Sequence, residues 1–208
     1  MKPRYLAIAL AAPVFFASCE NPADKTTTAE VSAAVAKTEA AVEGGVKYVF
    51  TPESQVNFIG SKVTGSHTGG FKTFTGHFTL KDGAPVGNDH TVVIEMTSTF
   101  SDDEKLTGHL KSPDFFDVEK FPYSSFDVTT VTKTSDTAYM IAGNFTLHGK
   151  TKNISFPATV IQTGDLVKID AKFDINRKDF DIVYAGKTDD LIRDEVVIEL
   201  KIQAKPEA

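Results

Sequence analysis

"YMIAGNFTLHGKTKNISFPATV", residues 139–160, carries apolar or small side chains at every second position on both sides of the polar tripeptide His148-Gly149-Lys150. A period of two places alternate side chains on opposite faces of a β-strand. A polar tripeptide with a central glycine between two such runs is typical of a hairpin turn. These residues therefore predict two antiparallel strands, each with one buried and one polar face.

The same alternation runs through the chain from Val46 onward and predicts eight strands. Their buried faces carry Val56, Phe58 and Gly60; Phe74, Gly76, Phe78 and Leu80; Val92, Ile94, Met96 and Ser98; Phe126, Val128 and Thr130; Tyr139, Ile141, Gly143, Phe145 and Leu147; Ile154, Phe156, Ala158 and Val160; Val167, Ile169, Ala171, Phe173 and Ile175; and Val196, Ile198, Leu200 and Ile202. An antiparallel sheet with one hidden face closes most simply on itself, because closure removes its edges. We therefore expect an all-β protein with an eight-stranded antiparallel barrel; a two-sheet sandwich is the alternative.

Two segments interrupt the alternation. Residues 101–116 have a loose helical spacing, with Ser101-Asp102 as a candidate cap and Pro113 as a break, and predict a short flanking helix. Residues 184–193, "YAGKTDDLIR", are polar and predict a long loop that covers an opening.

The N-terminus has the features of an export signal. Lys2 and Arg4 precede the apolar run 5–17, which is shorter than the roughly 20 residues that a membrane-spanning helix needs. Residues 16–19, Phe-Ala-Ser-Cys, resemble a bacterial lipobox, in which Cys19 would carry the lipid. We predict a lipoprotein signal peptide over residues 1–18 and a membrane-anchored protein of the bacterial cell envelope, on its periplasmic face. An ordinary signal peptide followed by a stray thiol is the alternative.

Residues 19–45 are predicted to be a lipid-anchored flexible tether, because they contain no aromatic residue and too little apolar bulk for a core. Residues 46–205 then form the barrel domain. Without Lys2 and Arg4 the chain has 20 basic and 28 acidic side chains, a formal charge of −8. This balance argues against binding to nucleic acid or to anionic lipid headgroups by charge, so we expect contact with the membrane through the anchor.

The five histidines show no metal-site spacing. No serine-hydrolase elbow, phosphate loop or dinucleotide fingerprint is present either. We therefore expect no catalytic residue, metal or cofactor. His67 and His109 are the candidates for the mouth of the barrel because glycine or an apolar turn flanks each of them.

The predicted interior combines large apolar side chains with the small residues Gly60, Gly76, Gly143, Ala158 and Ala171. Such positions leave room for an apolar chain, unless phenylalanine rings fill it. Burial of ten methylene groups contributes roughly 8 kcal/mol, which corresponds to about micromolar affinity before association costs. The predicted ligand-binding residues of the interior are Phe58, Phe74, Phe78, Ile94, Met96, Phe126, Val128, Tyr139, Ile141, Phe145, Phe156, Ile169, Phe173, Ile198 and Leu200.

Five segments in order resemble the YceI-like polyisoprenoid-binding family: "GSKVTGSHTGGFKTFTGHFTL", "GHLKSPDFFDVEKFPYSSFDV", "GNFTLHGKTKNISFPATV", "INRKDF" and "IRDEVVIEL". The resemblance covers about residues 46–204. It implies a lipocalin-like barrel with a helix beside it, whose tunnel holds an isoprenoid quinone, a polyprenyl chain or another long-chain amphiphile. It brings no catalytic residue. Phe58 replaces a tryptophan of many relatives, and Asp181 replaces a glycine.

The sequence therefore predicts a non-enzymatic lipid-binding protein that sequesters or carries an isoprenoid or other long-chain amphiphile. One alternative is an enzyme that acts on a lipid or quinone headgroup at the barrel mouth, with His67 or His109 as the acid–base group. The other is an inert structural or partner-binding envelope lipoprotein. A homodimer and a protein partner are left open.

Overall fold

The computed structural model describes residues 20–37, 44–85, 89–188 and 190–208. The predicted signal peptide and Cys19 lie outside these residues, so the structure carries no statement on either.

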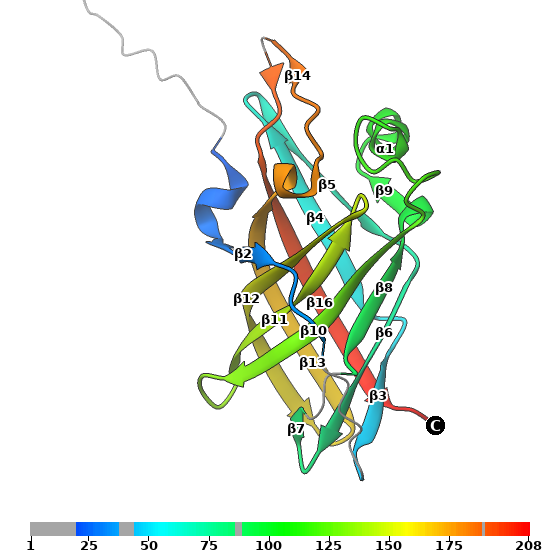
Figure 1. Cartoon of the computed structure of the whole chain (residues 1–208), viewed down its shortest axis with the longest axis vertical. Coiled ribbons are helices and arrows are strands. Elements are labelled where there is room, and N and C mark those ends of the chain that lie inside the picture. The colour runs from blue at the N-terminus through cyan, green and yellow to red at the C-terminus, as the bar shows by residue number, and fades with distance from the viewer. Residues whose placement is uncertain (1–19, 38–43, 86–88, 189) are drawn as a thin grey trace, which may run out of the picture.

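Eight antiparallel strands form the closed wall of a barrel (Figure 1). Five of them are continuous: β10 (Tyr123–Lys133), β11 (Ala138–Leu147), β12 (Lys150–Thr163), β13 (Leu166–Asn176) and β16 (Glu195–Pro206). Each of the other three is divided into two segments: β3 (Val46–Phe50) with β4 (Gln55–Lys62), β5 (Gly65–Phe71) with β6 (Phe74–Lys81), and β8 (Thr91–Glu95) with β9 (Thr99–Ser101). The 3-10 helix η2 (Met96–Ser98) joins β8 to β9. β16 pairs with β13 on one side and with β3 and β4 on the other, which closes the sheet. The predicted barrel is confirmed, and the sandwich is wrong.

Burial follows the predicted alternation along most strands. In β13, Val167, Ala171 and Phe173 are buried whereas Lys168 and Asp170 are exposed. These inward side chains form the apolar core that stabilises the wall.

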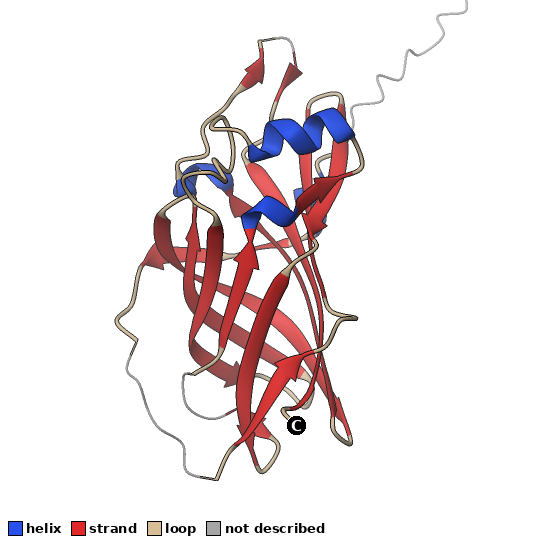
Figure 2. Ribbon diagram, turned by 90° about the vertical axis from the view of Figure 1, so that its right-hand side faces the viewer, coloured by secondary structure: helices blue, strands red, loops and turns tan. Residues whose placement is uncertain are grey.

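The two ends of the barrel differ (Figures 1 and 2). One end, the capped end, carries helix α1 (Glu104–Lys111), the crossover 112–122, the 3-10 helix η3 (Arg177–Phe180) and the short strands β14 (Gly186–Lys187) and β15 (Asp190–Leu191). The other end, the hairpin end, carries the β10–β11 and β12–β13 turns and β7 (Ala84–Pro85), which pairs with β6. The predicted loop 184–193 therefore contains a small hairpin, and it lies at the capped end.

Phenylalanines of the crossover attach it to the barrel. The Phe116 ring centroid lies 6.2 Å from that of Phe58, and the Phe121 centroid lies 4.9 Å from that of His148. The predicted helix is present, but its N-cap is Asp103 and not Ser101-Asp102, since Asp103 Oδ1 accepts the Leu106 N–H at 2.7 Å. The segment therefore packs as a lid of apolar rings over one end.

The N-terminal segment is where the fold departs most from the sequence-based expectation. η1 (Pro22–Lys25) is followed by β1 (Thr27–Thr28), which pairs in parallel with β13, and by β2 (Glu30–Ala33), which pairs antiparallel with β12. Figure 1 shows this segment, drawn in blue, beside β12. The flexible tether predicted for residues 19–45 is therefore wrong for residues 20–37, which we call the N-terminal arm.

The arm occupies a gap in the barrel wall. β12 and β13 pair only from Thr159–Asp170 to Thr163–Leu166, although both strands continue toward the capped end. Beyond this point the arm supplies the neighbouring backbone for both strands. Ala29 is 4% exposed and belongs to the main core cluster, and its N–H donates to the Asp174 carbonyl at 2.9 Å. The arm is thus part of the barrel wall.

Candidate ligand-binding cavity

The larger internal cavity occupies the half of the barrel toward the hairpin end and has a volume of about 410 Å³. This volume is in the usual range of small-molecule sites. Eight of the predicted ligand-binding residues line it: Phe78, Phe126, Val128, Tyr139, Ile141, Phe156, Ile169 and Leu200. Seven further apolar residues of the wall are Phe50, Leu80, Val92, Val131, Val160, Val167 and Ile202. The period-two pattern places five of these seven on inward faces; Phe50 and Val131 lie outside the predicted alternating runs.

The mouth of this cavity lies at the hairpin end and has a polar rim. Three hairpins line it: β6–β7 with Gly83 and Pro85, β10–β11 with Lys133 and Asp136, and β12–β13 with Gln162. Among the residues that the structure describes, the rim contains one ammonium group and one carboxylate beside hydrogen-bonding groups. It therefore suits a polar headgroup without a large net charge.

His90 contributes a buried ring to the same cavity wall. Its Nδ1 accepts the Thr79 N–H at 3.2 Å, so in the neutral ring the proton resides on Nε2. No sequence feature separates His90 from the other histidines, because its burial depends on the pairing of β6 with β8.

A second cavity of about 110 Å³ lies beneath the cap. Phe58, Ile94, Phe145 and Ile198 from the predicted set line it, together with Leu110, Phe115 and Phe116 from the cap. Its wall is almost wholly apolar, with the buried Arg177 at one side. Three of the predicted residues line neither cavity: Met96 and Phe173 are buried in the core, and Phe74 lines two further, more open pockets.

Arg177 holds the capped end together. Its guanidinium donates to the Ile182 carbonyl at 2.6 Å and to the Arg193 carbonyl at 3.1 Å, and it pairs with Asp194 at 3.1 Å. Burial lowers the pKa of Arg177, and the negative charge of Asp194 opposes this effect. An arginine nevertheless stays charged at physiological pH, so its hydrogen bonds and ion pair connect η3 to the loop that follows.

Most inward glycines do not open space in the interior. A Cβ on Gly76 would lie 2.4 Å from the Phe50 ring, and a Cβ on Gly143 would lie 2.5 Å from the Phe126 ring. These rings occupy the room that the glycines leave. Gly60 is different, because a Cβ there would meet nothing within 4 Å, and Gly60 lines the second cavity. The prediction that small inward residues leave room is therefore wrong at Gly76 and Gly143 and correct at Gly60.

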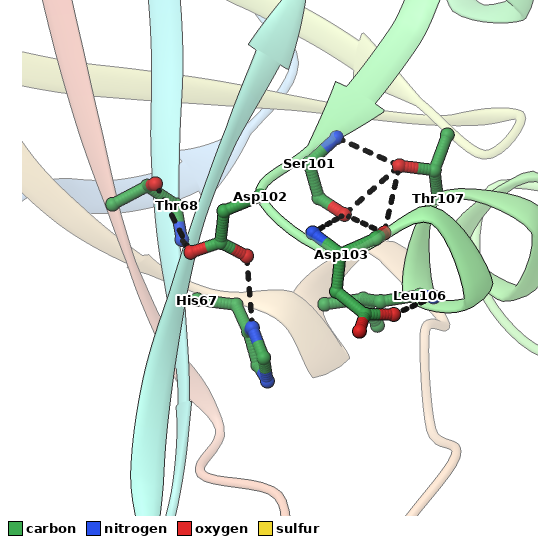
Figure 3. Close-up of polar contacts among 7 residues, drawn as sticks. All are labelled: His67, Thr68, Ser101, Asp102, Asp103, Leu106 and Thr107. Carbon is green, nitrogen blue, oxygen red and sulfur yellow. Dashed lines mark hydrogen bonds and ion pairs between the residues drawn. The ribbon is translucent and has the colours of Figure 1, made fainter.

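His67 and His109 each pair with a carboxylate on the surface of the capped end. His67 Nδ1 lies 2.8 Å from Asp102 Oδ1 (Figure 3). His109 Nε2 lies 2.8 Å from Asp114 Oδ2, and its ring packs against Tyr184. Neither histidine is among the described residues that line the two cavities. The predicted mouth is at the wrong end, because the larger cavity opens among the hairpins.

Hydrogen bonding favours the ionised form of Asp102. Its Oδ2 accepts the Thr68 N–H at 2.9 Å. This bond, together with the pairing with His67, lowers the pKa of Asp102. Its contribution to stability is therefore present above the unfolded pKa of about 3.9 and is lost as the pH falls through the folded pKa. The contribution is small, because the carboxylate is 44% exposed.

A family model for the YceI-like domain matches residues 48–204. The chain belongs to this family. Among curated YceI-like relatives, a UPF0312 protein of Pseudomonas putida (strain W619) is 29% identical over 187 residues, which cover 84% of this chain and 96% of the relative. A UPF0312 protein of Yersinia pestis (strain Pestoides F) is 32% identical over 120 residues, covering 55% of this chain and 62% of the relative.

Solved structures of similar fold include BcnA of Burkholderia cenocepacia, with a TM-score of 0.66 and 21% identity over 74% of this chain and 97% of the other. A polyisoprenoid binding domain from Saccharophagus degradans, implicated in plant cell wall breakdown, has a TM-score of 0.64 and 14% identity over 78% of this chain and 99% of the other. At these identities the likeness shows the fold. The YceI-like resemblance of the sequence is confirmed.

Both departures from the YceI-like pattern have a structural account. The Phe58 ring lies over Gly69, where a Cβ would approach within 2.4 Å. Asp181 ends η3 in the left-handed conformation, with φ of 57°, and its carboxylate pairs with Lys150 at 2.8 Å. A glycine adopts this conformation without strain, whereas Asp181 has an ion pair that a glycine would lack.

Within residues 20–37, 44–85, 89–188 and 190–208, no helix is long and apolar enough to span a membrane. The same residues contain no group of three or more histidine, cysteine, aspartate or glutamate side chains placed to hold a metal ion.

Proposed function

We propose that this YceI-like protein binds one long-chain amphiphile, of the isoprenoid or fatty class, in the larger cavity. The observation that carries the proposal is an apolar cavity of about 410 Å³ that opens at one end through a polar rim. The apolar tail would lie along the barrel, and the headgroup would lie beside Lys133, Asp136 and Gln162. The fold shared with a polyisoprenoid binding domain supports the same class of ligand.

Burial of the tail supplies the affinity in this proposal. Each methylene removed from water contributes about 0.8 kcal/mol, so a tail of roughly ten such groups reaches about micromolar affinity before association costs are subtracted. Apolar contacts of this kind do not distinguish an isoprenoid from a fatty chain, so the shape of the cavity and the rim set the selectivity. Binding and release, without chemistry, would then make the protein a carrier or reservoir.

The cellular setting is part of the proposal. The signal-like residues 1–18 and the lipobox-like sequence before Cys19 support export and a lipid anchor. More than one acyl chain is needed for stable attachment, and a bacterial lipoprotein cysteine meets that need. The protein would then hold its ligand at the periplasmic face of a membrane.

Native mass spectrometry of the protein that begins at Glu20 tests the proposal, because this form keeps the arm. We expect a bound lipid to copurify, or a fatty acid or polyprenyl alcohol to load with one-to-one stoichiometry. Ile141→Trp should reduce loading at least tenfold, because Ile141 lines the larger cavity. Met140→Trp is the matched control, because Met140 is the exposed neighbour on the same strand. If neither lipid class copurifies or loads, the proposal is wrong.

A further inference from the structure

The two cavities are separated by a layer about one side chain thick. Consecutive inward residues on the same strand line different cavities. In β16, Ile198 lines the second cavity and Leu200 lines the larger one; Ile94 and Val92 in β8, and Ser124 and Phe126 in β10, divide in the same way. Two residues along a strand span only about 6.6 Å. The cavities therefore lie end to end along the barrel axis and have no described lining residue in common.

Aromatic rings from β10, β12 and β13 form this layer on one side of the barrel. The Phe126 ring lies over Gly143, and its centroid is 5.6 Å from that of Phe156. Phe156 in turn stacks on Phe173, with centroids 4.1 Å apart and an interplanar angle of 9°. Phe156 and Phe173 are almost fully buried, whereas Phe126 is only half-buried and faces the larger cavity. Phe126 is thus the most accessible ring of the layer.

We propose that Phe126 sets the maximum length of the bound chain. This inference rests on the proposed function and names the residue that determines specificity within it. With the Phe126 ring over Gly143, the tail of a ligand ends at the floor of the larger cavity. Without the ring, the tail continues into the second cavity, whose 110 Å³ adds about a quarter to the 410 Å³ of the first. The preferred ligands of the native protein are therefore chains whose apolar part fills the larger cavity alone.

A homologous series of straight-chain fatty alcohols measures this limit. Dissociation constants for the protein that begins at Glu20 are obtained by displacement of a fluorescent fatty acid. Each added methylene should tighten binding about fourfold until the tail reaches the layer, after which affinity should stop rising. We call the chain length at which affinity stops rising the break. In Phe126→Ala the break should move to chains longer by several methylenes.

Two matched variants distinguish joined cavities from a merely enlarged one. Phe78→Ala also removes a ring from the wall of the larger cavity, but one inward position nearer the hairpin end, because Gly76 and not Phe78 pairs with Val92, the partner of Phe126. It should therefore shift the break less than Phe126→Ala. Gly60→Leu fills the second cavity without a clash at Cβ. It should leave the native break unchanged and reduce the shift that Phe126→Ala produces.

Each outcome has a distinct meaning. If no fatty alcohol, no fatty acid and no polyprenyl alcohol binds the native protein, the proposed function is wrong. If chains bind but the native protein shows no break, or Phe126→Ala does not move it, the length limit is overturned while lipid binding stands. If Phe126→Ala fails to fold, Gly60→Leu alone still decides, because a shortened break in that variant would mean that the native cavities already communicate.

Discussion

The β10–β11 and β12–β13 seams of this barrel join strands of similar length in two different ways. β10 and β11 pair from Ser125–Thr146 to Lys133–Tyr139, with one irregularity near Val128. β12 and β13 pair over five positions only, and the N-terminal arm occupies the rest of the gap. Buried backbone groups need partners, and a segment distant in sequence supplies them as well as a hairpin does. A barrel wall can therefore be completed by a segment that looks like a linker.

Pro157 accounts for the place where the β12–β13 seam opens. The Val160 N–H donates to Thr137 beside β11, and backbone groups of alternate residues point to the same side of a strand. The nitrogen of Pro157 therefore faces β13, where a proline has no hydrogen to donate. The last β12–β13 pair, Thr159–Asp170, lies two residues away. The loss of this donor ends the ladder and leaves the edges that the arm covers.

Deletion of residues 20–37 should have the largest effect on this comparison. The change removes the β1 and β2 pairings and exposes the buried Asp174 and the core beside Ala29. We expect the free energy of unfolding to fall by about 3 kcal/mol or more, with self-association through the uncovered strand edges. Urea denaturation and size-exclusion chromatography measure the two effects.

A synthetic peptide of residues 20–37 is the control for that deletion. Added in trans, it should restore the denaturation midpoint in a concentration-dependent way, because a ligand that binds only the folded state stabilises it. An unchanged midpoint in the deletion variant would show that the arm does not complete the wall.

The contrast between the seams also explains which features the sequence could predict. Period-two runs such as 167–175 predicted the strands correctly, because a strand with one buried face alternates apolar and polar residues in the sequence. The arm is held by backbone pairing and by small residues such as Ala29, which produce no such alternation in the sequence. For the cavity, alternation predicted the inward residues, but not that Phe126 covers Gly143, since ring orientation depends on neighbouring strands. Alternation likewise did not indicate that the polar rim of the larger cavity lies among the hairpins, away from His67 and His109.

Ala29→Leu should have an intermediate effect. Ala29 is buried against the core where the arm crosses from β13 to β12, so three extra carbon atoms would overpack the site. We expect a loss of about 1–3 kcal/mol in the free energy of unfolding. Ala33→Leu, at the exposed end of β2, is the matched control and should change stability by less than about 0.5 kcal/mol. Equal effects of the two substitutions would contradict the burial of Ala29.

Asn144→Ala should have the smallest effect, because Asn144 contacts the arm only at its outer end, and Asn153, which donates to Asn144 Oδ1 at 3.2 Å, keeps its bond to Thr129. The Asn144 side chain accepts the Val35 N–H at 3.0 Å and donates to the Val35 carbonyl at 2.7 Å, so one amide replaces two backbone partners. These contacts are exposed, and we expect a loss of about 0.5–1.5 kcal/mol. Hydrogen exchange should show faster exchange of the Val35 amide, with the amides of residues 30–33 little changed.

Asn57→Ala, on the outer face of β4, controls for the loss of an asparagine from the surface, because its bond to Gln55 is 3.4 Å long. It should leave exchange of the arm unaltered. If exchange rises equally along the whole arm in Asn144→Ala, the arm detaches as one unit. The backbone pairs of the arm with β12 and β13 would then open together. Exchange confined to Val35 would mean that the strand pairings hold independently of the outer contact, because each backbone pair with β12 or β13 is satisfied locally.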